Sequence, residues 1–118
     1  MSKIIAAANS MLANQEKISS VMAGEQTPSE MFFLYDNKYI WSINKSSGHY
    51  WLCFYPGNHS VEDIASTQDW DTINFVTYST KEIGAREALD TFAELYTVAK
   101  EKLFGVNQVL DDIISDLT

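Results

Sequence analysis

The first fifth of the chain carries apolar residues at helical spacing. Between residues 3 and 23 they fall on one broad stripe at a period of 3.6 residues: Ile4, Ile5, Ala8, Met11, Leu12, Ile18, Val21 and Met22. Gly24 and the segment Thr27-Pro28-Ser29 then bring residue types that end helices and form loops. The pattern therefore predicts an N-terminal helix over 3–23.

From Met31 to Tyr55 the pattern changes to the alternation of strands. Asp36-Asn37 fits a two-residue hairpin turn, because both residue types tolerate a positive φ. Lys45-Ser46-Ser47-Gly48 fits a four-residue hairpin loop with Gly48 in the left-handed region. These two loops predict a meander of three strands, at about 31–35, 38–44 and 49–55.

The second half of the chain returns to helical spacing. Ser60 is a candidate N-cap for one or two helical turns within 60–67, and residues 72–79 predict a fourth strand. Ser79 with Glu82 forms a capping box that opens a long helix, about 81–103, which Gly105 ends. A last helix, about 106–117, is predicted to place Val109, Leu110, Ile113 and Leu117 on one side and Asp111, Asp112 and Asp116 on the other.

These elements predict one α+β domain over residues 1–118. It has an N-terminal helix, a four-stranded and mainly antiparallel sheet (the meander plus one strand), a long helix and a short acidic C-terminal helix. A chain of 118 residues is long enough to bury a core without disulfides or metal.

The two hairpin loops also determine which side chains share a face of the sheet, because side chains alternate along a strand. The predicted core face consists of Phe32, Leu34, Tyr39, Trp41, Ile43, Tyr50, Leu52 and Phe54, with Ile73 and Phe75 from the fourth strand. The other face mixes aromatic and polar residues: Met31, Phe33, Tyr35, Lys38, Ile40, Ser42, Asn44, His49, Trp51, Cys53 and Tyr55, with Asn74, Val76 and Tyr78. A slip of one residue in either loop would exchange the two sets.

The mixed face is the candidate functional surface. Tyr and Trp are enriched where one end of a side chain is dry and the other wet, and a contiguous aromatic patch is seldom left bare on a monomer. Three alternatives follow: the 60–67 helix or the C-terminal helix covers it, a second copy of the chain covers it, or it holds a partner or ligand. The candidate binding residues on it are Tyr35, His49, Trp51, Tyr55, Asn74 and Tyr78.

Composition and charge narrow the classes of function. Apolar residues make up 46% and charged residues 20%, which excludes an intrinsically disordered chain. The net charge of −8 argues against direct nucleic-acid binding, and it suits a basic partner. Mimicry of nucleic acid is less favoured, because the acidic surplus is largest after residue 80 rather than uniform. With no secretory signal and no apolar run of membrane-spanning length, we expect a cytoplasmic protein without a membrane partner.

No constellation of residues points to catalysis, a metal or a cofactor. Cys53 and His49 share one strand about 13 Å apart, too far for a nucleophile and its base, while His59 follows a turn that could bring it back toward Cys53. The acidic residues around Trp70 lack the spacing of a calcium loop, and the single Arg86 is expected to pair with Glu82 or Asp90. We therefore expect no catalytic residue, metal or cofactor.

The sequence favours a non-catalytic, acidic protein-binding module, homodimeric, that uses the mixed face of its sheet. The alternative is a small-molecule-binding protein, in which Tyr35, Trp51, Tyr55, Asn74 and Tyr78 line a cleft between sheet and helix. A nucleic-acid mimic and a small enzyme that uses His59 with Cys53 are less favoured alternatives.

Overall fold

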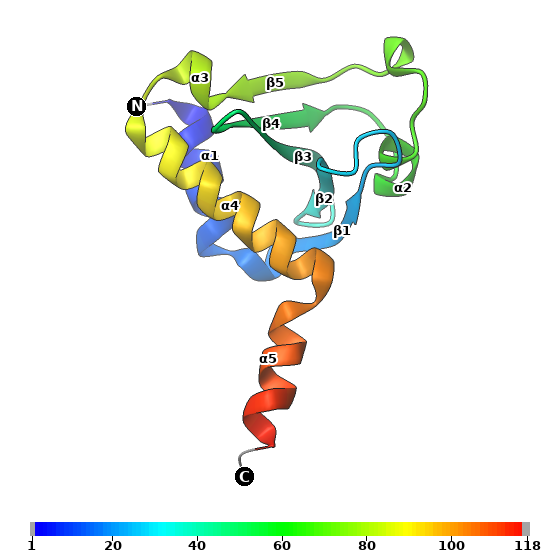
Figure 1. The fold of residues 1–118 in the computed structure, drawn as a ribbon. Helices are drawn as coiled ribbons and strands as arrows, with labels where there is room; N and C mark the ends of the chain where they lie inside the picture. Colours follow the sequence, from blue (N-terminus) through cyan, green and yellow to red (C-terminus); the bar gives the residue numbers. More distant parts are fainter. Residues whose placement is uncertain (1, 117–118) are drawn as a thin grey trace.

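The computed structural model describes residues 2–116 and shows one antiparallel sheet with helices on both sides (Figure 1). The strands are β1 (Ile18–Ala23), β2 (Met31–Tyr35), β3 (Tyr39–Ser46), β4 (His49–Tyr55) and β5 (Val76–Ser79). The helices are α1 (Lys3–Ala13), α2 (Val61–Ala65), α3 (Thr80–Ile83), α4 (Arg86–Phe104) and α5 (Val106–Ser115), with short 3₁₀ helices η1 (Gln15–Lys17) and η2 (Trp70–Thr72).

The α+β class, the antiparallel sheet and the order of its elements are confirmed. Within the described residues the sheet has five strands in the order β1-β2-β3-β4-β5, so each strand pairs with its neighbour in sequence. The sequence predicted four, because residues 18–23 were assigned to the first helix. The predicted helix over 3–23 is wrong beyond Ala13.

Asn14 is the C-cap of α1, and the chain continues through η1 into β1. Its backbone N–H donates to the carbonyl oxygens of Ser10 and Met11, and its side-chain Nδ2 donates to the Ser10 oxygen at 2.9 Å. The β1 strand contains a bulge between Ser19 and Met22, where Ser20 adopts a φ of +52°. The bulge lets both Ile18 and Val21 pack in the same core, which is why their spacing also fits a helix.

The turn between β2 and β3 contains the predicted residues but has a different length. Asp36 and Asn37 have φ values of +56° and +57°, as their residue types predicted. The loop also includes Lys38, so Tyr35 pairs with Tyr39 and the register differs by one residue from the prediction. The two faces of β2 are therefore exchanged relative to the prediction. The predicted core face holds Met31, Phe33 and Tyr35, and the predicted mixed face holds Phe32 and Leu34.

The turn between β3 and β4 is shorter than predicted by two residues. Ser46 pairs with His49, and the two residues between them, Ser47 and Gly48, have φ values of +52° and +80°. A difference of two residues returns every side chain to its original face, so the predicted face assignments of β3 and β4 are correct.

Two separate clusters of buried side chains lie on the two faces of the sheet. On the helix face, which α1 and α4 cover, the core contains residues such as Ile5, Phe33, Leu52, Phe92 and Leu95. On the opposite face, called here the α2 face, a smaller core is built from Phe32, Ile40, Cys53, Tyr55, Val61, Ile64 and Ala65. The sheet is therefore apolar at its centre on both sides.

The second half of the chain departs in detail from the prediction. The fourth predicted strand, 72–79, forms strand only as β5, and the predicted 81–103 helix is divided by Gly84, at a φ of +74°, into α3 and α4. The predicted caps are confirmed: Ser60 Oγ accepts from the Asp63 N–H at 3.1 Å, and Ser79 Oγ accepts from the Glu82 N–H at 3.0 Å. Leu117, predicted on the apolar side of the last helix, lies outside the described residues.

Candidate functional site

The six predicted binding residues do not lie on one surface. His49, Trp51 and Tyr55 share the α2 face, as predicted. Tyr35 and Tyr78 lie on the helix face instead, since Tyr35 pairs with Tyr39 and Tyr78 with Leu52. Asn74 is exposed in the segment that precedes β5. Tyr35 was assigned to the wrong face because the β2–β3 turn is one residue longer than predicted. Tyr78 was assigned to the wrong face because the long 56–75 connection does not determine which face each residue of β5 takes.

Much of the mixed face that the sequence predicted is covered by the chain itself. Val61, Ile64 and Ala65 of α2 are buried against it, and the Trp70 ring stacks on Phe32 at 6.1 Å with an angle of 13°. The covering by the 60–67 helix, one of the three alternatives, therefore holds for this part. His49 and Trp51 remain half-buried beyond the cover.

Tyr55 belongs to a buried polar cluster rather than to an open binding surface. Its phenol oxygen lies 2.8 Å from Ser42 Oγ and donates to Glu30 Oε2 at 3.3 Å, while Ser42 donates to the same carboxylate oxygen at 2.5 Å. Burial, and then the negative charge of Glu30, raise the pKa of Tyr55 well above its ordinary value. The phenol is thus held protonated as a donor.

The thiol–imidazole alternative finds no support in the surroundings of Cys53. Its sulfur lies 3.5 Å from the Thr77 hydroxyl, and burial raises the pKa of the thiol, whereas a nucleophilic cysteine needs a lowered one. His49 Nδ1 lies 3.0 Å from the Thr80 hydroxyl, and His59 is exposed. Cys53 therefore behaves as a small buried apolar residue.

A cluster of aromatic side chains is partly open on the helix face, at the edge of the core against which Trp41 and Tyr78 pack. This aromatic patch consists of Tyr39, Trp41, Phe54, Val76 and Tyr78. The Phe54 ring lies 5.1 Å from that of Trp41 and 6.4 Å from that of Tyr39, and the four rings line a shallow hollow of about 250 Å³. Tyr39 is 46% exposed and Val76 is 47% exposed. The sequence placed most of these residues in the core.

The second open apolar surface is on α5, which extends away from the sheet in Figure 1. Every side chain from Asn107 to Asp116 is exposed. The apolar residues Val109, Leu110, Ile113 and Ile114 are between 47% and 61% exposed, and they lie on one stripe of the helix. The sequence predicted this amphipathic helix but not that its apolar side would lack a core.

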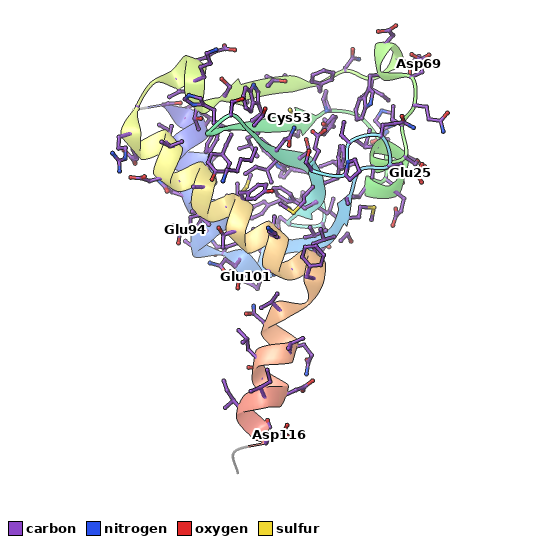
Figure 2. All side chains as sticks on the ribbon, in the orientation of Figure 1. Glu25, Cys53, Asp69, Glu94, Glu101 and Asp116 are labelled. Atoms are coloured by element: carbon purple, nitrogen blue, oxygen red, sulfur yellow. The ribbon has the colours of Figure 1, made fainter. Side chains whose placement is uncertain are left out.

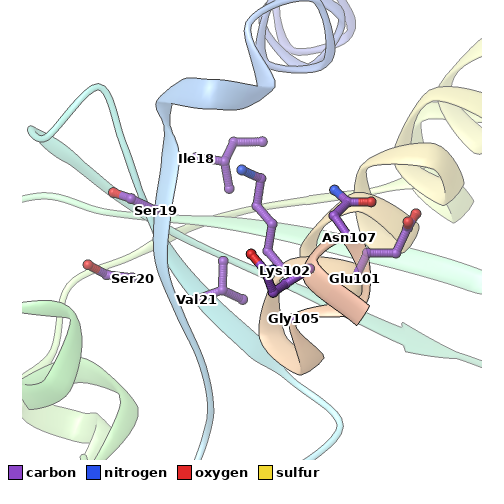
Figure 3. A pocket seen from close by; sticks show the side chains of 9 residues that line it. Ile18, Ser19, Ser20, Val21, Glu101, Lys102, Gly105 and Asn107 are labelled. Atoms are coloured by element: carbon purple, nitrogen blue, oxygen red, sulfur yellow. The ribbon is translucent and has the colours of Figure 1, made fainter. Parts of the chain in front are cut away.

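Two hollows flank the junction of α4 and α5. A groove of about 430 Å³ lies between β4 and α4; its lining includes Tyr50, Tyr96, Phe104, Lys45 and Lys100. The second, of about 280 Å³, separates β1 from the junction, and Figure 3 shows Lys102 extending from α4 toward β1 inside it. Figure 2 shows Glu101 close to the junction and Asp116 at the far end of α5.

Within residues 2–116, no group of three or more histidine, cysteine or acidic side chains is arranged to hold a metal ion. In the same part of the chain, no helix combines the length and apolar character that a membrane crossing requires. Arg86 Nε and Asp90 Oδ1 are 3.3 Å apart on the surface of α4, which confirms one of the two predicted pairs.

Comparisons with protein-family models, with curated proteins and with solved structures found no match for this chain.

Proposed function

We propose that this chain is a non-catalytic protein-binding module, homodimeric, that holds another protein on the aromatic patch of its sheet. The observation that carries the proposal is the open cluster of Tyr39, Trp41, Phe54 and Tyr78 beside the helix-covered core. Tyrosine and tryptophan are the residue types that contribute most to protein interfaces, since they bury a large area at a small cost in conformational entropy. The surface thus differs from the predicted mixed face, while the class of function is the one that the sequence favoured.

The partner that fits this surface is a protein segment with apolar and basic residues. The rings supply the apolar contact, and the net charge of −8 attracts cationic groups and speeds their encounter. An acidic partner would be repelled by the same field, so charge provides selectivity while the patch provides affinity.

Display selection with the full chain tests the proposal. A library of random peptides is panned on the immobilised protein, and the selected peptides are measured by titration calorimetry. We expect enrichment in lysine or arginine next to large apolar residues. Tyr39→Ser and Tyr78→Ser are each expected to weaken binding about tenfold or more, because an aromatic anchor at an interface contributes more than 1 kcal/mol.

Thr77→Ala is the matched control, because Thr77 lies between Val76 and Tyr78 on β5 but points to the opposite face. The dissociation constant of a selected peptide for this variant is expected to stay within about threefold of that for the unchanged chain, below the tenfold change expected for the two tyrosine variants. Peptides that bind Tyr39→Ser and Tyr78→Ser as tightly as the unchanged chain would contradict the proposal, as would a selection that yields no binder.

The groove beside α4 favours a second candidate function, the binding of a small anionic molecule. Tyr50 and Tyr96 form an aromatic pair 5.6 Å apart, and the ammonium group of Lys45 lies 5.7 Å from the Tyr50 ring. The volume of about 430 Å³ is within the range of ligand sites. Thermal-shift screening with aromatic carboxylates tests this candidate: a hit that stabilises the chain but not Tyr96→Ala would support it, and the absence of such a hit would contradict it.

A further inference from the structure

The helix α5 is short, amphipathic and separated from the fold. Gly105 adopts a φ of +64° and ends α4, so α5 starts in a new direction and leaves the sheet behind. A helix of ten residues is marginal in water without tertiary packing, and most helical stability in proteins comes from burial of an apolar face. The stripe of Val109, Leu110, Ile113 and Ile114 is that face, and it needs a surface to cover it.

Charge identifies the kind of surface that fits. Residues 106–116 contain three aspartates, Asp111, Asp112 and Asp116, and no lysine or arginine. An amphipathic helix that binds an anionic membrane surface carries lysine and arginine on its polar side, so α5 has the wrong sign for that role. The complement of α5 is an apolar surface with positive charge at one end.

The positive charge lies at the N-terminal end of α5, next to Gly105, which is called here the root of α5; its C-terminal end is called the tip. The two hollows beside Gly105 are lined by three lysines, Lys45, Lys100 and Lys102, and by one acidic residue, Glu101. Phe104, which is 66% exposed, lines the larger of these hollows next to the start of α5. One copy of the chain therefore presents both halves of a complementary pair, acidic at the tip of α5 and basic at its root.

We infer that α5 pairs antiparallel with α5 of a second copy of the chain, which specifies the interface of the homodimer proposed above and rests on that proposal. A ten-residue helix is about 15 Å long, so full antiparallel overlap brings the tip of each α5 to the root of the other. Asp112 and Asp116 of each copy then lie near the lysines of the other, and the two helix dipoles oppose each other favourably. A parallel pair would instead bring the two aspartate groups together.

The size of the apolar surface is sufficient for a weak specific dimer. Five large side chains of each copy, Phe104, Val109, Leu110, Ile113 and Ile114, are about half to two thirds exposed. Doubled by the two-fold axis, they supply on the order of 1,000 Å² of buried surface, which is the lower limit for a specific interface. The dimer is therefore expected to dissociate on dilution.

Sedimentation equilibrium of the full chain between about 1 μM and 1 mM tests the inference. The mass is expected to rise from 13.3 kDa toward twice that value. Ile113→Glu is expected to raise the dissociation constant about 100-fold or more, because each substitution occurs twice in a symmetric interface. Ile113→Leu keeps an apolar side chain at the same position and is the control; its dissociation constant is expected to change less than about threefold. The position is exposed, so circular dichroism should show an unchanged fold.

Disulfide trapping determines the orientation of the two helices. Val106→Cys and Ile114→Cys are placed in separate, differently tagged chains, mixed and oxidised, with the unchanged chain as a control for the buried Cys53. Antiparallel pairing around Leu110 predicts the mixed Val106→Cys/Ile114→Cys product. Cross-links of Ile114→Cys chiefly to itself would overturn the antiparallel arrangement.

A dimer that persists in Ile113→Glu would overturn the α5 interface and leave the homodimer proposal standing. A chain that stays monomeric up to 1 mM would overturn both. Neither result would affect peptide binding at the aromatic patch, which is measured separately.

Discussion

The phenol of Tyr55 and the carboxylate of Glu30 meet at 3.3 Å although they are 25 residues apart in sequence. The Ser42 hydroxyl lies against both groups, and Thr27 Oγ1 donates to the other carboxylate oxygen at 3.1 Å. This cluster attaches the loop between β1 and β2 to the centre of the sheet. A partly buried carboxylate with several donors is stabilising only while each donor keeps its proton, so the protonation of Tyr55 bears on the stability of the fold.

The raised pKa of Tyr55 predicts a loss of stability at alkaline pH. In the unfolded chain the phenol ionises near its ordinary pKa of 10, whereas in the folded chain burial and Glu30 keep it protonated. The contribution is therefore fully present below pH 10 and lost above it, with a slope of up to about 1.4 kcal/mol per pH unit. Urea unfolding at intervals from pH 8 to pH 12 measures this slope.

Tyr55→Phe removes the ionisation and provides the test of its origin. At neutral pH we expect this variant to lose about 1 kcal/mol, the net value of a buried hydrogen bond. Above pH 10 its unfolding free energy should fall less steeply than that of the unchanged chain. Trp41→Phe, which removes no ionisable group, should keep the original slope. Parallel curves for the unchanged chain and Tyr55→Phe would contradict this account.

Local sequence signals identified most elements of the fold correctly. The caps at Ser60 and Ser79, the helix break at Gly105 and the positive φ of Asp36 and Asn37 follow from the chemistry of single residues, and all are observed. Gly24, in contrast, ends no helix, because α1 already ends at Ala13. The length of the β2–β3 turn does not, because Lys38 can occupy a strand or a turn equally well. Because Lys38 belongs to the turn, the register of β2 moves by one residue and each of its side chains lies on the face opposite to the predicted one.

The candidate site was harder to predict because it depends on what covers each face. The sequence showed that both faces are rich in aromatic residues, but not that Trp70 would close one of them. It also showed an amphipathic last helix, but helical periodicity cannot reveal that Gly105 directs α5 away from the core. Periodicity indicates that a face must be covered; only the tertiary structure shows whether the same chain covers it.

The two-residue turn between β3 and β4 predicts a stabilising substitution. Ser47 has a φ of +52°, a conformation that costs serine more than asparagine. Ser47→Asn is therefore expected to raise the free energy of unfolding by about 0.5 kcal/mol. Ser46→Asn is the control, because Ser46 is in extended strand conformation, where asparagine gives no gain. Equal effects of the two substitutions in urea unfolding would show that the turn conformation is not the cause.

Replacing Trp41 by phenylalanine is expected to cost little stability. Its Nε1 is the one buried side-chain nitrogen or oxygen among the described residues that has no hydrogen-bond partner. Trp41→Phe removes this unpaired donor and keeps an aromatic ring beside Phe54, so it should change the free energy of unfolding by less than about 1 kcal/mol. In Tyr55→Phe, by contrast, a paired donor is lost. A larger loss for Trp41→Phe than for Tyr55→Phe, measured by urea unfolding at neutral pH, would contradict this interpretation.

The Trp70 ring is expected to keep the α2 face closed over its core. Its ring stacks on Phe32 and lies 6.0 Å from the ring of Tyr55, so it holds the segment after α2 over the core that contains Cys53. Trp70→Ala should remove about 2–3 kcal/mol of stability, as expected for truncation of a large, partly buried ring. Local opening should then expose Cys53 more often, and its rate of labelling by a thiol reagent should rise about tenfold or more. Trp51→Ala is the control, because Trp51 lies on the same strand and face as Cys53 but outside the cover; its labelling rate should change less than about threefold. If both variants label at the same rate, Trp70 does not close this face.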